Sequence, residues 1–123
     1  MNKLTIIGNL TNDPEMRTTQ DGKSVCNFSV AVNRRKKPGK EQETDYFRIS
    51  AWNGTAESCA KYLTKGRKVC VIGSVSVHPY KDKNGDPRAS IEVLAEDVEF
   101  LSSKSESIDQ QTGYMKVDME VPY

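Results

Sequence analysis

Residues 45–52 read Asp-Tyr-Phe-Arg-Ile-Ser-Ala-Trp, and their alternation gives the clearest indication of the fold. Successive side chains of a β-strand point to opposite faces of a sheet. One face of this segment would carry the apolar side chains of Phe47, Ile49 and Ala51. The other face would carry two aromatic rings, a cation and a hydroxyl, from Tyr46, Arg48, Ser50 and Trp52. We therefore expect a strand with one buried and one exposed face.

Other segments of the chain also have strand patterns. Runs that alternate, or that are rich in apolar and β-branched residues, occur at residues 4–10, 26–33 and 69–77. Asp21-Gly22 and Asn84-Gly85 are tight-turn signals that each lead into a strand. After the second of these turns, residues 88–101 are expected to return as a strand that breaks or bends near Ala95-Glu96. About five strands are therefore expected.

One helix is expected between the third and fourth of these strands. Apolar side chains recur at helical spacing at Ala56, Cys59, Ala60 and Leu63. Residues 53–55 supply candidate capping side chains, and Gly66 is the expected stop. This order is typical of an OB-fold, a small five-stranded Greek-key barrel that often binds oligonucleotides. The expected fold class is all-β with one helix and a disordered C-terminal tail.

The length of 123 residues fits one domain with a short appendage. Residues 1–101 would form the domain. Residues 102–117 are polar and lack periodicity, so they are expected to be a disordered linker. Residues 118–123 combine carboxylates with apolar side chains and form a distinct tip.

Charge is divided unevenly along the chain. Residues 1–90 carry a net charge of +7, and residues 91–123 carry −6. Such an asymmetry is typical of a chain that binds nucleic acid or another polyanion. An ordinary solvated basic face remains the alternative.

Several functional classes are disfavoured. No stretch approaches the roughly 20 consecutive apolar residues that cross a bilayer, and Gly8 interrupts the short N-terminal apolar run, so neither membrane insertion nor a signal peptide is expected. The three cysteines, Cys26, Cys59 and Cys70, lack metal-site spacing and are expected to be buried thiols in a reducing compartment, the cytoplasm. No nucleophile motif accompanies the single histidine, His78, and no phosphate-binding loop is present. We expect no enzymatic activity, no cofactor and no metal.

Aromatic and basic residues instead indicate a nucleic-acid surface. Bases stack on exposed aromatic rings for about 1 to 3 kcal/mol each, and cations neutralise phosphates. The predicted DNA-binding residues are Trp52, Tyr46, Tyr80, Arg48, Arg34, Arg35, Lys36, Lys37, Lys81, Lys83, Arg88, Lys3 and Phe28. Two alternatives stay open. Tyr46 and Trp52 could pack beneath a loop or a subunit partner, and the basic loop over residues 34–40 could be a solvated hairpin tip.

Several motifs resemble the bacterial single-stranded DNA-binding protein (SSB) family, including its phage-borne relatives. They are Gly8-Asn9-Leu10 followed by Asp13-Pro14-Glu15 and Arg17, then Phe28–Asn33, Thr44–Arg48, Ala51-Trp52, Ala60–Gly66 and Tyr80-Lys81-Asp82. The resemblance covers residues 1–101. It implies an OB-fold, usually a homotetramer, that wraps single-stranded DNA without strong sequence preference during replication, recombination and repair.

The resemblance also assigns individual roles. It places base-stacking positions at Tyr46, Trp52 and Tyr80, where the family prefers tryptophan, phenylalanine and tryptophan. One further stacking aromatic of the family is missing, and Arg34–Lys37 occupies that region. Stacking is therefore expected to persist with altered strength, and charge is expected to replace one ring.

The end of the chain departs from the family pattern. Family members end in several acidic residues, an aliphatic residue, proline and phenylalanine, and use this tip to bind partner proteins. Here the corresponding residues are Asp118, Glu120, Val121, Pro122 and Tyr123, with fewer carboxylates and a terminal tyrosine. The resemblance implies that replication, recombination and repair proteins bind this tip. A host nucleoid-associated protein and a phage or plasmid variant both fit, as do a tetramer and a dimer.

Two other functions compete with this one. The first is an OB-fold adaptor of the primosome type with weak nucleic-acid binding, but an adaptor has no reason to align Tyr46, Arg48 and Trp52. The second is an OB-fold nuclease, which the lack of a metal-binding carboxylate cluster disfavours. A non-enzymatic single-stranded DNA-binding protein is the function that we expect.

Overall fold

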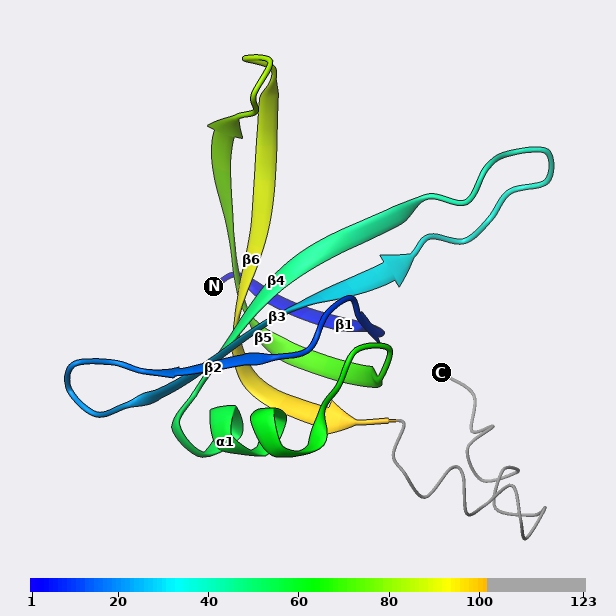
Figure 1. Ribbon diagram of the computed structural model, residues 1–123. Helices are drawn as coiled ribbons and strands as arrows, with labels where there is room; N and C mark the ends of the chain where they lie inside the picture. The colour runs from blue at the N-terminus through cyan, green and yellow to red at the C-terminus, as the bar shows by residue number, and fades with distance from the viewer. Residues whose placement is uncertain (102–123) are drawn as a thin grey trace, which may run out of the picture.

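The computed structural model describes residues 1–101, which form six strands and one helix (Figure 1). The elements are β1 (Lys3–Leu10), β2 (Glu15–Thr18), β3 (Ser24–Asn33), β4 (Thr44–Trp52), α1 (Asn53–Tyr62), β5 (Lys68–Lys81) and β6 (Pro87–Phe100). The linker and tip expected at residues 102–123 lie outside the described residues.

The strands close into a ring. Their order is β1-β5-β6-β4-β3-β2, and an additional pairing of β1 with β3 joins the ends of a five-stranded barrel. The β4–β6 pair is parallel and the other pairs are antiparallel. The helix α1 packs mainly against β3 and β4. The predicted all-β OB-fold with one helix is therefore confirmed.

The short strand β2 was not predicted. It pairs with β3 outside the ring, and its four residues are all exposed, so it has no apolar alternation to reveal it. The expected turn at Asp21-Gly22 connects the two strands: Gly22 has φ +82° and donates its N–H to the Thr19 carbonyl at 2.9 Å. The hairpin therefore extends the sheet beyond the barrel.

The ends of the helix differ from the prediction. Trp52 is the N-cap residue and no side chain caps the helix, so the expected role of residues 53–55 is wrong. The helix ends at Tyr62, earlier than the expected stop at Gly66. Gly66 instead has φ +91° and donates its N–H to the Leu10 carbonyl, which ties the exit of α1 to β1.

The barrel core confirms the alternation of β4. Ile49 and Ala51 are buried, whereas Tyr46 is 62% and Trp52 38% exposed. Two of the cysteines behave as expected, because Cys26 and Cys59 are buried free thiols and Cys70 is half-buried. Burial is the main cause that raises the pKa of Cys59 to about 12, with a smaller contribution from the charge of Cys26.

The long strands β5 and β6 bend where the sequence suggested. Their register shifts between Ile72 and Gly73, which leaves Glu96 as the extra residue of a β-bulge. A Cβ atom on Gly73 would collide with the Leu94 carbonyl, so glycine is needed for this close approach. Beyond the bulge the two strands continue as an arm, here called the β5–β6 arm (residues 76–92), that projects from the barrel (Figure 1).

The predicted hairpin at Asn84-Gly85 forms the tip of this arm. Gly85 has φ +81° and donates its N–H to the Asp82 carbonyl at 2.9 Å. The Asp82 side chain accepts hydrogen bonds from the N–H groups of Asn84 and Asp86, both at 2.9 Å. A second projection, the β3–β4 loop (residues 34–43), leaves the barrel in another direction (Figure 1).

Candidate nucleic-acid interface

The base of the β5–β6 arm and the strand β4 border an open groove of about 600 Å³, here called the arm groove. It is lined by Tyr46, Arg48, His78, Tyr80, Ala89, Ser90, Ile91 and Glu92. Tyr46 and Arg48, which the sequence placed on one strand face, therefore line the same groove as Tyr80, which it predicted separately. The two tyrosines are 62% and 53% exposed. Ring faces of this kind are available to flat aromatic ligands.

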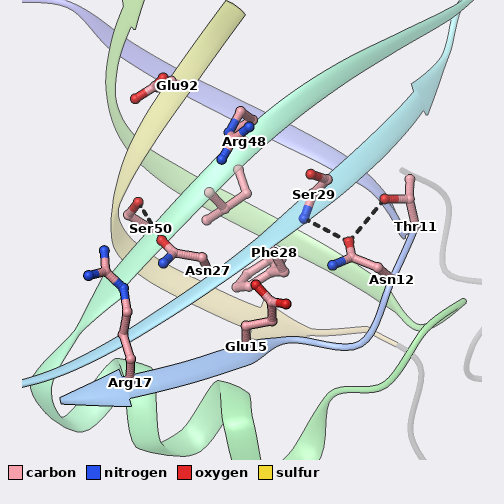
Figure 2. A pocket seen from close by; sticks show the side chains of 11 residues that line it. Thr11, Asn12, Glu15, Arg17, Asn27, Phe28, Ser29, Arg48, Ser50 and Glu92 are labelled. Atoms are coloured by element: carbon pink, nitrogen blue, oxygen red, sulfur yellow. Dashed lines mark hydrogen bonds between the residues drawn. The ribbon is translucent and has the colours of Figure 1, made fainter.

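A second groove, here called the polar groove, adjoins the first and has a volume of about 580 Å³ (Figure 2). It is lined by Thr11, Asn12, Glu15, Arg17, Asn27, Phe28, Ser29, Arg48, Ile49, Ser50 and Glu92. Arg48 and Glu92 line both grooves, so the two surfaces are continuous. The polar groove therefore offers hydrogen-bonding groups beside the aromatic ones of the arm groove.

Hydrogen bonds organise the polar groove. The Ser50 hydroxyl donates to Asn27 Oδ1 at 2.9 Å, which joins β4 to β3. Asn12 Oδ1 accepts from the Ser29 N–H at 3.3 Å and from the Thr11 hydroxyl at 3.1 Å (Figure 2). These bonds hold the amide groups of Asn12 and Asn27 in fixed positions along the groove.

Trp52 lies at the other end of β4, away from Tyr46. It lines a third depression, of about 330 Å³, together with Ser50, Ser74, Val75, Ser76, Glu92, Val93 and Leu94. Ser50 and Glu92 also line the polar groove, so the surface continues from Tyr46 to Trp52 along one face of β4. The two rings and one cation that the sequence placed on one side of this strand, Tyr46, Trp52 and Arg48, therefore lie on a single exposed face of β4.

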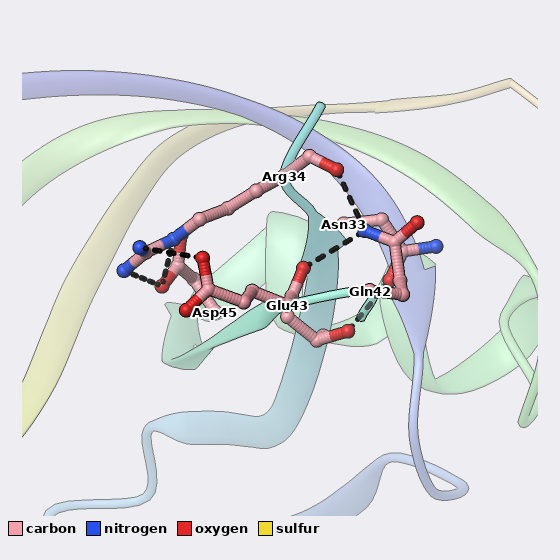
Figure 3. Close-up of polar contacts among 6 residues, drawn as sticks. Asn33, Arg34, Gln42, Glu43 and Asp45 are labelled. Carbon is pink, nitrogen blue, oxygen red and sulfur yellow. Dashed lines mark hydrogen bonds and ion pairs between the residues drawn. The ribbon is translucent and has the colours of Figure 1, made fainter. Parts of the chain in front are cut away.

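The basic β3–β4 loop contains both paired and available cations. The Arg34 guanidinium donates to both carboxylate oxygens of Asp45, with Nε at 3.1 and 3.0 Å and Nη2 at 2.9 Å (Figure 3). Glu43 lies 3.5 Å from the same group. Hydrogen bonds to Asp45, then the charges of Asp45 and Glu43, raise the pKa of Arg34, and the same pair lowers the pKa of Asp45. No ion pair within residues 1–101 occupies Arg35, Lys36 or Lys37.

Other predicted cations are similarly divided. Lys3 contacts the carboxylate of Glu96, and the Arg88 guanidinium donates to Asp82 Oδ2 at 3.0 Å. These contacts lower the pKa values of Glu96 and Asp82. Lys81 and Lys83, near the tip of the arm, form no ion pair with another described residue. To contact DNA, Lys3 would have to break its contact with Glu96, and Arg88 its contact with Asp82, so that each could bind a phosphate instead.

Phe28 lies in the core rather than on the surface. It is 3% exposed and packs in the main apolar cluster, and it reaches only the floor of the polar groove. A buried ring has no free face for a base, so we do not retain Phe28 as a DNA-binding residue.

Several residues that line these grooves were not assigned from the sequence, among them Arg17, Asn27, His78 and Glu92. Arg17 and Asn27 approach the site because β2 and β3 pair there. Glu92 approaches it because β6 pairs in parallel with β4, opposite Arg48. These pairings join segments that are distant in the sequence, so sequence patterns alone do not reveal them. His78, by contrast, is an isolated histidine on a basic hairpin, and this pattern could have indicated that it belongs to the site.

Within residues 1–101 no group of three or more His, Cys, Asp and Glu side chains is placed to hold a metal ion. No helix in the same range is long and apolar enough to cross a membrane.

Comparison with known proteins gives consistent matches. Residues 1–101 match the family described as the single-strand binding protein family. The chain is 38% identical over 110 residues to single-stranded DNA-binding protein 1 of Clostridium acetobutylicum, covering 88% of this chain and 100% of that protein. It is 43% identical over 106 residues to a single-stranded DNA-binding protein of Caldanaerobacter subterraneus, covering 85% and 71%. It is 37% identical over 117 residues to single-stranded DNA-binding protein 1 of Staphylococcus aureus strain Mu50, covering 94% and 75%.

Proposed function

Because the chain belongs to the single-strand binding protein family, we propose that it binds single-stranded DNA through the arm groove and the exposed face of β4. It is a non-enzymatic single-stranded DNA-binding protein. Coating and protecting exposed strands during replication, recombination and repair is the biological role that follows, in the bacterial cytoplasm where such strands arise.

The observation that carries this proposal is the meeting of Tyr46, Arg48 and Tyr80 in one groove. Two exposed rings from different strands can each stack a base, and the Arg48 guanidinium, which lines the same groove, can contact a phosphate or a ring face. Every base has a π-face, so this mode of binding tolerates any sequence. A duplex keeps its bases stacked inside and could not use these rings.

Cations on the two projections from the barrel would follow the phosphate backbone. Arg35, Lys36 and Lys37 on the β3–β4 loop, and Lys81 and Lys83 on the β5–β6 arm, form no ion pair within the described part of the chain. Each phosphate that a cation neutralises releases counterions, which makes binding favourable and dependent on salt.

Fluorescence titration tests this function directly. Trp52 is the only tryptophan and lines the proposed surface, so saturating oligo-dT should quench its emission. A duplex of equal length at the same salt concentration should quench it much less, because its bases cannot stack on the protein. Equal affinity for duplex and single strand would contradict the proposal.

Two further proposals concern protein partners. We propose that the chain self-associates as a homotetramer, a step supported by Val77 of β5, an apolar side chain that is 60% exposed. We also propose that residues 118–123 recruit replication, recombination and repair proteins, through Asp118, Glu120, Val121, Pro122 and Tyr123. Light scattering would test the first. Pull-down with residues 113–123 deleted would test the second, and unchanged capture of partners would contradict it.

A further inference from the structure

His78 lies in the arm groove and faces a carboxylate from the neighbouring strand. Its Nε2 atom is 3.7 Å from Glu92 Oε1 and 3.2 Å from the Ser76 hydroxyl. Both members of the His78–Glu92 pair are accessible, with side chains 58% and 47% exposed. The pair is therefore open both to solvent and to any ligand in the groove.

Glu92 occupies a central place on the proposed DNA surface. It lines the arm groove, the polar groove and the depression around Trp52. In the sheet it lies opposite Arg48 of β4 on one side and opposite Ser76 of β5 on the other. A carboxylate at this position repels phosphates, which is an unexpected property in a surface that binds a polyanion.

We propose that His78 is a pH-dependent DNA contact, which offsets the repulsion of Glu92 and attracts phosphate when its imidazole is protonated. Histidine side chains ordinarily change charge between pH 5 and 8. Affinity for single-stranded DNA then rises as the pH falls through this range. The inference rests on the proposed function, because it requires DNA to lie in the arm groove.

The groups around His78 define the charge change. Arg48 faces it from β4 and Glu92 from β6, so their charges cancel while the imidazole is neutral. The remaining neighbours with polar side chains are the hydroxyls of Tyr46, Tyr80, Ser76 and Ser90. The nearby Arg88 is already bound to Asp82. Protonation therefore changes the net charge of this cluster from zero to +1.

The Ser76 hydroxyl is compatible with both states of the ring. It can donate to an unprotonated Nε2, and it can accept from a protonated one. The charge of His78 can therefore change without breaking this contact, and the ring stays in the groove at either pH.

Two substitutions of His78 mimic its two charge states. Affinity for labelled oligo-dT is measured at pH 8.0 and pH 5.5 in the full chain and in the variants His78→Gln and His78→Arg. Oligo-dT is the probe because thymine does not take up a proton in this range. Since this chain has one histidine, the part of the pH response that His78→Gln removes can be traced to one side chain.

In the unsubstituted chain, we expect binding to tighten about fivefold at pH 5.5, which is the effect of one unit charge about 4 Å from a phosphate in water. The slope of log K against log salt should also steepen by about 0.7. In both variants the ratio of the two affinities should fall to about one fifth of its value in the unsubstituted chain. A ratio in His78→Gln equal to that of the unsubstituted chain would overturn the inference.

Glu92 gives an independent test. At pH 8.0, Glu92→Gln should bind oligo-dT about fivefold more tightly, because a repulsive charge is removed. Glu57→Gln is the matched control, since Glu57 is an exposed carboxylate on α1 outside these grooves and its removal changes the net charge equally. Weaker binding by Glu92→Gln would show that Glu92 accepts hydrogen bonds from bases, and would overturn the inference.

Failure of the inference can be distinguished from failure of the proposed function. If the chain binds oligo-dT at both pH values but His78→Gln keeps the full pH response, only the inference is wrong. If the unsubstituted chain binds oligo-dT at neither pH, the function itself is contradicted.

Discussion

Arg34 and Lys36 carry the same charge on one loop but differ in what they can offer to a phosphate. The guanidinium of Arg34 forms three hydrogen bonds to Asp45, whereas Lys36 has no ion pair within residues 1–101. The sequence revealed four adjacent cations but not this difference, because the partner of Arg34 lies 11 positions away across the β3–β4 pair. Alternation along β4, by contrast, was enough to predict which of its side chains are exposed.

This difference predicts different salt dependences. Replacing Lys36 and Lys37 together by serine should flatten the slope of log K against log salt by up to about 1.4, at about 0.7 for each phosphate that no longer has a cation beside it. Arg34→Ser should leave the slope nearly unchanged, because Asp45 already occupies that guanidinium. The measurement is a titration with oligo-dT at four salt concentrations. A slope that flattens as much in Arg34→Ser as in the lysine variant would show that the ion pair opens for DNA.

Among the strands and the helix, the elements that could be predicted from the sequence are those with a pattern of apolar residues. The long strands have alternating or continuous apolar runs, and the bend near Ala95-Glu96 follows from a glycine opposite the bulge. The strand β2 has four exposed residues and is held by its pairing with β3, so its own sequence contains no signal. The helix start also differs from its prediction, because Trp52 rather than a polar side chain occupies the N-cap position.

The two projections from the barrel are elements of different kinds. The β5–β6 arm is a regular ladder that continues to Lys81 and Pro87, and its tip is closed by hydrogen bonds to Asp82. The β3–β4 loop extends past the last paired residues, Asn33 and Thr44, and is held at its base by the Arg34 contacts with Asp45 and Glu43 (Figure 3). The arm can therefore present Tyr80 at a fixed position, whereas the loop can adjust its free cations to the path of a strand.

At the scale of the whole molecule, closure of the barrel creates the site. The parallel pairing of β4 with β6 places Arg48 opposite Glu92, and the β5–β6 ladder places Tyr80 across the groove from Tyr46. Strand periodicity predicted the exposed rings of β4, and the basic hairpin indicated Tyr80. Neither pattern could predict this meeting, because it depends on which strands pair and in which register. The resemblance to a known family supplied the roles of the rings, and the fold supplies their common groove.

The central claim is that single-stranded DNA stacks on Tyr46 and Tyr80 in the arm groove. The most direct test measures the affinity of labelled oligo-dT for Tyr46→Ala, Tyr80→Ala and Tyr62→Ala at one salt concentration. Tyr62 is the matched control, since it is a 54% exposed tyrosine on α1 that lies outside the groove. We expect each groove variant to lose about 1 to 3 kcal/mol of binding free energy and Tyr62→Ala to bind as the unsubstituted chain does. Groove variants that keep a folded circular dichroism spectrum and bind as tightly as Tyr62→Ala would contradict the claim.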